Sequence, residues 1–301
     1  MERILLTLTS SESKRLIGKA VAALPQVRAA FQSGIIFIAT STSSAYVAEE
    51  LLDITIAKKG LFTAGVVVPR GFCVTSSEQR RALQYGYIGV AQGKISMKVS
   101  RTQLLEQWLP QMDHDDIFIK GVNAIDSMGL AAIALGRGEQ GRGSGGTIGS
   151  VIGAVTCRGI QLVLPAGLEK LVPGSLIDVT STVGALFKYA AGLPSGMMPI
   201  KGTLITEIHA FQVLTDTTAI PVAAGGIDGA EGAHTFVIEG PPDAVEEAWK
   251  LYQTVKGEPP LNTITMNCDE CKMGCSFHSD PTLIALRNTR SNLQGRMQPK
   301  G

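Results

Sequence analysis

The sequence predicts an α/β protein with an open, mostly parallel β-sheet and helices on both faces. Three short apolar runs, residues 34–39, 116–120 and 160–164, are typical of strands buried on both faces of a parallel sheet. Strands that alternate with helical segments at this spacing favour a parallel arrangement. We expect this α/β domain to cover residues 1–195.

The composition excludes several classes of protein. The chain has 301 residues, of which 45% are hydrophobic and 18% charged, so it can bury a sizeable core. The net charge of +1 is too small to indicate binding to nucleic acid or to an anionic membrane. No apolar stretch approaches the roughly 18 residues of a membrane-spanning helix, and the N-terminus lacks a signal-peptide pattern. We therefore expect a cytoplasmic protein, with a homo-oligomer left open.

The N-terminal part predicts a strand at residues 3–8 followed by a helix. Thr9 lies three residues before Glu12, which is the spacing of a capping box. The apolar run 34–39 leads into TSTSS, residues 40–44, and then into the helix-forming AYVAEELL. Hydroxyl groups in such a turn either hold phosphate oxygens together with helix amides or simply cap the helix.

The following segments predict shorter elements. Residues 63–68 predict a strand, whereas residues 71–93 match no single pattern. Ser100 and Gln103 can cap a short helix, and residues 176–182, LIDVTST, predict a strand.

The stretch from residue 116 to residue 149 predicts the centre of a ligand site. Asn123 and Asp126 follow the buried run 116–120, where an open α/β sheet keeps its ligand crevice. A loop with seven glycines between residues 136 and 149 then leads into a predicted helix at residues 147–158. Glycine permits close approach of backbone amides to a ligand, and a helix N-terminus favours an anion.

We therefore expect the turns at residues 40–44 and 121–149 to form one anion site. The expected ligand-binding residues are Thr40, Ser41, Thr42, Ser43, Ser44, Lys120, Gly121, Asn123, Gly143, Gly145, Gly146 and Thr147. Asp126 is the expected catalytic acid/base or ligand anchor, although a carboxylate in this place can equally cap a turn. Glu207 and His209 lie two residues apart, so on a helix they point in different directions and form no dyad.

The last third of the chain predicts a small α+β subdomain at residues 196–260 and a cysteine-containing tail at residues 261–301. The subdomain contains a predicted helix at 204–214, strands at 220–224 and 234–239, and a helix that begins at Pro241.

The tail carries a possible metal-binding pattern. Cys268, Cys271 and Cys275 have the spacing C-x2-C-x3-C, and His278 follows three residues later. Three thiolates and one imidazole complete a tetrahedral zinc site, and the same thiolates could instead hold an iron–sulfur cluster. Free cytosolic thiols are the alternative.

Three stretches, IIFIATSTSSAYVAEEL, DIFIKGVNAID and GRGSGGTIGSVIGAV, occur in an order that resembles the superfamily of ribose-5-phosphate isomerase, glucosamine-6-phosphate deaminase and the CoA transferases. The similarity covers roughly residues 12–180 and implies a Rossmann-like domain that binds a sugar phosphate or CoA. The first loop lacks the family's glycine, and the helix at residues 147–158 contains no carboxylate to act as the isomerase base. The CoA transferases use a glutamate nucleophile in a glycine-bearing turn, and Glu231 in DGAEGAH is similar to it; the simpler alternative is a solvated turn residue.

These observations leave three functions open. The chain is an enzyme for acyl transfer or sugar-phosphate chemistry, other than a standard ribose-5-phosphate isomerase. Alternatively it is a ligand-sensing protein of the same fold without catalysis, or a platform for a metal or redox module.

Overall fold

The computed structural model describes residues 1–83, 86–136, 145–184, 187–271 and 273–285. The fold is mixed α/β, as predicted, and is built around a six-stranded mixed sheet. The strand order is β12 (Thr203–Ile205), β10 (Gln161–Pro165), β7 (Ile117–Ile119), β2 (Ile35–Ile38), β5 (Tyr87–Ala91) and β6 (Lys94–Val99). The pairs from β12 to β2 are parallel, whereas β2–β5 and β5–β6 are antiparallel.

The buried run 116–120 forms the centre of this sheet. All three residues of β7 are buried between β2 and β10, which explains why the run shows no polar alternation. Phe118 stacks on Phe37 of β2 with ring centroids 5.4 Å apart. From the unassigned segment 71–93, β5 joins this sheet antiparallel to β2, and the following strand β6 forms the edge.

Three helices from the first part of the chain pack together beside the sheet: α1 (Ser10–Ala23), α2 (Pro25–Ser33) and α3 (Thr42–Leu52). The predicted capping box is present at the start of α1, because the Thr9 side chain accepts from the Glu12 amide and the Glu12 carboxylate accepts from the Thr9 amide. A Cβ at Gly18 would lie 2.9 Å from the Tyr46 carbonyl carbon, so glycine permits the close packing of α1 on α3.

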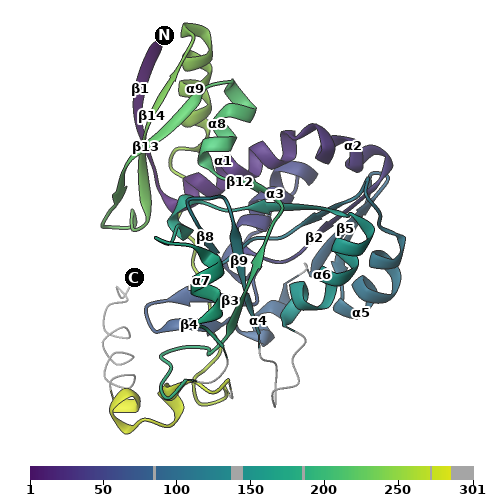
Figure 1. Cartoon of the computed structure of the whole chain (residues 1–301), viewed down its shortest axis with the longest axis vertical. Helices are drawn as coiled ribbons and strands as arrows, with labels where there is room; N and C mark the ends of the chain where they lie inside the picture. The colour runs from purple at the N-terminus through teal and green to yellow at the C-terminus, as the bar shows by residue number, and fades with distance from the viewer. Residues whose placement is uncertain (84–85, 137–144, 185–186, 272, 286–301) are drawn as a thin grey trace, which may run out of the picture.

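The N-terminal strand belongs to a second sheet, which lies at one end of the molecule (Figure 1). β1 (Glu2–Leu8) pairs antiparallel with β14 (Ala233–Gly240), which also pairs with β13 (Thr218–Gly225). The helices α8 (Glu207–Thr215) and α9 (Pro242–Val255) pack against this sheet. The expected boundary at residue 195 therefore does not separate the sheets, because pairing joins the first strand to one near residue 240.

A third, antiparallel sheet corrects two expectations. It contains β8 (Ala124–Ile125), β9 (Ala131–Leu135) and β11 (Gly196–Ile200), so the connection after residue 120 is partly strand. The segment predicted as a strand at residues 176–182 is instead helix α7 (Leu176–Ser181). Leu176 and Thr180 are its buried residues, and their spacing of four places both on one helical face.

The remaining elements include the hairpin β3 (Gly65–Val68) and β4 (Gly71–Val74) and the helix α4 (Ser77–Ala82), which lie in the lower part of the molecule in Figure 1. The others are the helices α5 (Arg101–Gln103) and α6 (Gly146–Arg158), and the short turns of helix η1 (Lys59–Leu61), η2 (Leu104–Trp108), η3 (Leu109–Gln111), η5 (Leu168–Lys170) and η6 (Ser276–His278). The cap predicted for Ser100 and Gln103 is present.

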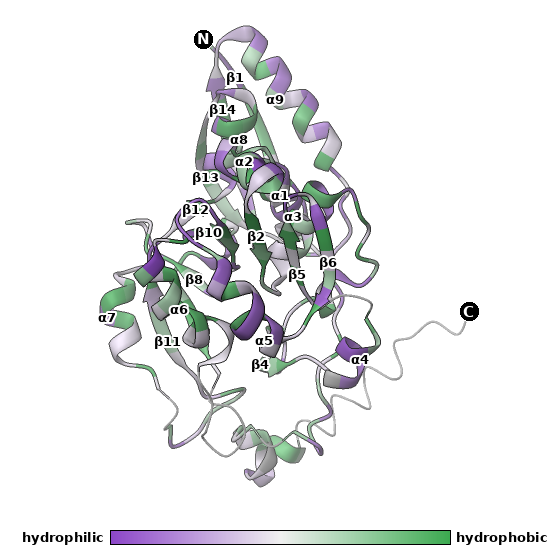
Figure 2. Ribbon diagram, turned by 90° about the vertical axis from the view of Figure 1, so that its right-hand side faces the viewer, coloured by the Kyte–Doolittle hydropathy of each residue, from purple (hydrophilic) through white to green (hydrophobic). Residues whose placement is uncertain are grey.

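Hydropathy along the ribbon follows this architecture (Figure 2), with hydrophobic central strands and mixed outer helices. Among the described helices, none combines the length and the apolar character that crossing a membrane requires.

Candidate functional site

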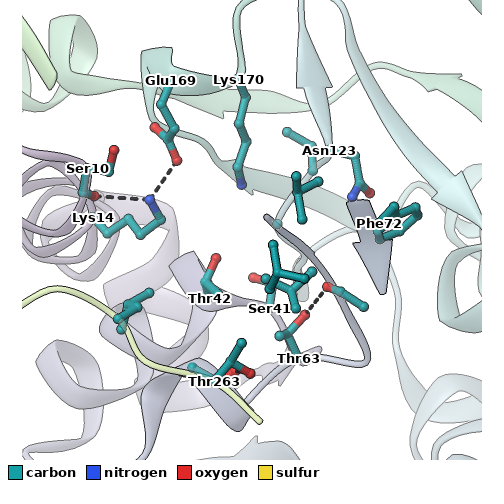
Figure 3. A pocket seen from close by; sticks show the side chains of 18 of the residues that line it. Ser10, Lys14, Ser41, Thr42, Thr63, Phe72, Asn123, Glu169, Lys170 and Thr263 are labelled. Carbon is teal, nitrogen blue, oxygen red and sulfur yellow. Dashed lines mark hydrogen bonds and ion pairs between the residues drawn. The ribbon is translucent and has the colours of Figure 1, made fainter. Parts of the chain in front are cut away.

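A pocket of about 1420 Å³ lies between the six-stranded sheet, the β13–β14 loop and the β3–β4 hairpin, and Figure 3 shows part of its wall. Its wall combines the start of α1, the β2–α3 turn, the end of β7, the start of α6 and η5. The turns expected to converge, residues 40–42 and 121–123 together with 145–147, all line it. The carboxyl end of β7 therefore faces a real cavity, in the place where open α/β sheets hold ligands.

Three lysines provide positive charge to this pocket: Lys14 of α1, Lys120 after β7 and Lys170 of η5. Burial, reinforced by the charge of Lys170, lowers the pKa of Lys120 to about 8. Burial also lowers the pKa of Lys170 to about 8, with Lys14 adding repulsion and Glu169 opposing it. Figure 3 shows the side chains of Lys14 and Lys170 extending toward the same space.

One of the carboxylates that line the pocket lies directly beside the lysines. Glu169 Oε1 accepts from the Lys14 ammonium at 2.6 Å, and Lys14 also donates to the Ser10 carbonyl at 3.0 Å. Burial acts to raise the pKa of Glu169, but the charges of Lys14 and Lys170 outweigh it and leave the pKa below its usual value. Glu169 is therefore an ionised partner for Lys14.

Glu207 lies behind this carboxylate and has the opposite shift. Its side chain is fully buried and accepts from the Leu168 amide at 3.0 and 3.2 Å. Burial, with the negative charge of Glu169, raises the pKa of Glu207 to about 7. His209 turns the other way, where its Nδ1 lies 3.2 Å from the Thr206 amide, so no Glu207–His209 dyad forms.

The hydroxyl turn after β2 caps helix α3, as one of its two expected roles required, and three of its residues also line the pocket. Ser41 is the N-cap of α3, and its Oγ accepts from the Ser44 amide at 2.9 Å. Thr40, Ser41 and Thr42 line the pocket, and Figure 3 shows Thr42 among its wall residues. Ser43 and Ser44 are completely buried and do not line the pocket, which corrects their assignment as ligand-binding residues.

The end of β7 approaches this turn closely. A Cβ on Gly121 would collide with the Ser41 side chain, so only glycine leaves room for the two turns to meet. The Lys120 ammonium donates to the Gly121 carbonyl at 3.1 Å. Asn123 also lines the pocket, and its Oδ1 accepts from the Ala134 amide at 2.9 Å.

Helix α6 starts at the pocket with two successive glycines in the left-handed region. Gly145 has φ 75° and Gly146 has φ 70°, and no side chain caps this helix start. Thr147 lines the pocket as well, with its hydroxyl 2.5 Å from the Tyr87 hydroxyl. Gly143 lies outside the described residues.

Asp126 does not line the pocket, and the structure corrects its expected catalytic role. Its Oδ1 accepts from the Met128 and Leu130 amides at 3.0 and 2.9 Å, and its Oδ2 accepts from the Leu176 amide at 3.1 Å. These hydrogen bonds, that from Leu176 first, hold the pKa of Asp126 below its usual value. The carboxylate ties the β8–β9 turn to the start of α7.

Glu231 lies on the loop between β13 and β14 and lines the pocket, although its side chain is exposed. The Ser10 hydroxyl lies 3.2 Å from the Glu231 carbonyl oxygen and fixes this loop beside α1. The structure thus brings Glu231 to the same cavity as the lysines.

Sequence reasoning missed Lys14, Glu169 and Lys170. Lys14 lies within helix α1, whereas Glu169 and Lys170 lie in the short turn η5, and the Lys14–Glu169 ion pair brings these remote segments together. The sequence offered one signal for this part of the site. Glu169 and Lys170 follow the carboxyl end of strand β10, where α/β sheets hold their ligands.

The cysteines of the tail lie apart from the residues that line the pocket. Cys268 Sγ accepts from Arg70 at 3.0 Å, and Cys275 Sγ accepts from the Gly192 amide at 3.1 Å. The side chain of His278 lies outside the described part of the chain, so the expected fourth ligand is not placed.

The comparisons with known proteins add no family to this description. No protein-family model, no curated protein and no solved structure matches the chain.

Proposed function

We propose that this protein binds a small phosphorylated or CoA-like anion in the pocket, with Lys120 and Lys170 as its cationic contacts. One observation carries the proposal. The amines of Lys120 and Lys170 face the cavity, and within the described part of the chain neither forms an ion pair with a carboxylate. An anion in the pocket is the partner that these amines lack.

Electrostatics supports an anion over a neutral ligand. Lys14, Lys120 and Lys170 repel one another, whereas the pocket's buried carboxylate, Glu169, is already paired with Lys14. At neutral pH both lysines with a pKa of about 8 remain mostly protonated. A bound phosphate relieves the repulsion, and the positive charge holds it more strongly in a partly dry pocket than in water.

Backbone amides provide the second support. The N-terminus of α6 has no side-chain cap, and residues 145–147 line the pocket. The first amides of a helix lack internal partners and favour a negative group. The resemblance of residues 12–180 to sugar-phosphate isomerases and CoA transferases points to the same ligand class.

A catalytic role at this site is a second candidate function. A lysine whose pKa is about 8 exchanges a proton close to neutral pH, which suits acid/base or nucleophilic chemistry. This favours acyl transfer or sugar-phosphate chemistry over simple ligand sensing. Because the α6 segment has no carboxylate, we expect no ribose-5-phosphate isomerase turnover.

The test is a titration of the protein with inorganic phosphate, ribose 5-phosphate and CoA, followed by calorimetry and thermal unfolding. At about 100 times its dissociation constant, a ligand stabilises the fold by about 2.7 kcal/mol. Lys120→Met and Lys170→Met are expected to weaken binding at least about tenfold, because a hydrogen bond to a charged group contributes about 1.5–3 kcal/mol.

Lys94→Met is the matched control, because Lys94 is exposed on β6 away from the pocket. Its affinity is expected to equal that of the wild type. Absence of binding for all three ligands, or equal weakening by the control, would contradict the proposal.

A further inference from the structure

Strand β4 and the C-terminal segment, which are far apart in the sequence, both lie at the lower end of the molecule in Figure 1, and together they carry four of the five cysteines. Cys73 lies on β4, and Cys268, Cys271 and Cys275 lie on the C-terminal segment beside it. All four are half-buried, whereas Cys157 is exposed on α6. Cys73 therefore lies near the three cysteines of the tail, although it is not part of their C-x2-C-x3-C motif.

Strand alternation directs Cys73 away from the anion pocket. Phe72 and Val74 line that pocket, and successive side chains of a strand point to opposite faces. Cys73 consequently faces the other side of β4.

Backbone pairing fixes the tail on one side of Cys73. Thr265 forms an antiparallel bridge with Thr75, and the Met266 amide donates to the Val74 carbonyl at 2.9 Å. These contacts bring Cys268, two residues after Met266, to the hairpin. Arg70, in the turn before β4, donates to the Cys268 sulfur at 3.0 Å.

A second set of contacts fixes Cys275. Gly192 forms a parallel bridge with Phe72, the residue before Cys73, and its amide donates to the Cys275 sulfur at 3.1 Å. The Ser276 amide in turn donates to the Ala190 carbonyl at 2.8 Å. Cys275 is thereby held beside β4 through residues 190–192.

The thiols also act on one another electrostatically. Burial raises the pKa of Cys73, and Cys268, Cys275 and Cys271 raise it further against the opposing charge of Arg70. All three tail cysteines thus lie within electrostatic range of Cys73.

From this convergence we propose that Cys73, Cys268, Cys271 and Cys275 ligate a 4Fe–4S cluster. Cys73 replaces His278 as the fourth ligand, which makes the set four thiolates, the standard set for such clusters. The cluster lies behind the pocket wall formed by Phe72 and Val74.

The four sulfurs are not grouped closely enough for a single zinc ion. Around one zinc, thiolates lie about 2.3 Å from the metal and hence about 3.8 Å from one another. Among the described residues, Asp113, His114 and Asp115 are the sole group of three potential ligands whose atoms lie within 4.8 Å of one another. No three of the four thiols are that close, and a cube of iron and sulfide separates its cysteines by more than one ion does.

The surroundings of the thiols suit the same cofactor. Hydrogen bonds from Arg70 and from the Gly192 amide already reach two of the sulfurs. Donors to the cysteine sulfurs stabilise the negative charge of a cluster and raise its reduction potential. Hydrogen-bond donors of this kind also surround buried zinc sites, so they favour a cluster only in combination with the spacing of the sulfurs.

The test is anaerobic purification of the full chain, with iron and acid-labile sulfide measured after cluster reconstitution. We expect about four iron and about four sulfide per chain, with the paramagnetic signal of a reduced cluster after dithionite treatment. Cys73→Ala and Cys271→Ala are expected to lower the iron content several-fold or to change the signal and reduction potential. Cys157→Ala and His278→Ala are the matched controls and keep both unchanged.

Several outcomes would overturn the proposal. They are one equivalent of zinc without sulfide, fewer than about one iron per chain after reconstitution, and a Cys73→Ala protein with unchanged iron content, signal and potential. The wild-type spectrum reports the cluster even if a variant fails to fold. Anion binding in the pocket is measured separately, so failure here leaves the proposed function standing.

Discussion

Lys14 and Arg15 are neighbours on α1, yet they enter two charged regions of opposite character. Arg15 donates to Glu49 at 2.7 Å, to Glu50 at 2.9 Å and to Glu258 at 2.9 Å. Lys14 enters the pocket and meets a single carboxylate, Glu169. Successive residues of a helix point about 100° apart, so one turn of α1 serves both regions.

The region around Arg15 is balanced. Three cations, Arg15, Lys19 and Lys59, share ion pairs with three carboxylates, Glu49, Glu50 and Glu258. Arg15 and Lys59 also lie over the ring of Tyr46, at 4.7 and 5.1 Å from its centroid.

The part of the pocket between α1, the end of β7 and η5 has an excess of positive charge. Lys14, Lys120 and Lys170 share it with Glu169, and the raised pKa of Glu207 keeps that group half-protonated near neutral pH. The region around Arg15 therefore has its charges paired within the protein, whereas the proposed function assigns the missing negative charge of the pocket region to a bound anion.

The largest expected effect comes from breaking the balanced region. Arg15→Met leaves Glu49 and Glu258 largely buried without their principal partner, which is expected to cost about 3–5 kcal/mol of unfolding free energy. Urea unfolding measures the change. Arg3→Met, at an exposed ion pair, is the control and is expected to cost less than about 1 kcal/mol; similar losses for both variants would show that the Arg15 cluster is not structural.

A pH series tests the buried carboxyl of the pocket region. The pKa of Glu207 rises from 4.5 to about 7 on folding, so the folded protein keeps a proton that the unfolded chain releases between these values. Its contribution to stability is present below pH 4.5 and is lost as pH rises toward 7. Glu207→Gln is expected to flatten this fall by on the order of 2 kcal/mol, measured by urea unfolding across the range. Parallel pH profiles for both proteins would contradict the assignment.

Asp126 distinguishes a structural carboxylate from the carboxylates of the pocket. Asp126→Asn weakens hydrogen bonds from three backbone amides and is expected to cost about 1–2 kcal/mol of stability. Affinity for phosphate is expected to stay unchanged. Asp115→Asn, at an exposed site, controls for loss of charge alone. A selective loss of phosphate affinity in Asp126→Asn would restore Asp126 to the ligand site.

The smallest expected change is in the stability of Lys120→Met. The pKa of Lys120 falls from 10.5 to about 8 on folding, so stability rises with pH between these values and the full cost of burying the ammonium is present below about 8. Removing the charge is expected to raise stability at neutral pH by up to about 1 kcal/mol, while ligand binding is lost. Calorimetry at neutral and alkaline pH measures both. A large loss of stability would place Lys120 with Arg15 among structural charges.

Local chemistry determined much of the fold from the sequence alone. Thr9 with Glu12 and Ser100 with Gln103 form the predicted capping boxes, because their hydrogen bonds close within a few residues. The run at residues 116–120 contains a buried strand, because unbroken apolar character suits a strand covered on both faces. Of the predicted site, the β2–α3 turn, residues 120–123 and the glycines at the start of α6 do share one pocket.

Tertiary structure decided everything that depends on distant partners. Contacts between remote segments determine three features that the sequence did not predict. β1 pairs with β14, residues 176–181 form helix α7, and Asp126 lies outside the pocket. Lys14 joins Lys170, and Cys73 joins the tail cysteines, only where separate elements pack together. The periodicity of apolar residues in the sequence indicates which face of an element is buried. Long-range packing determines which charged groups and thiols lie next to one another.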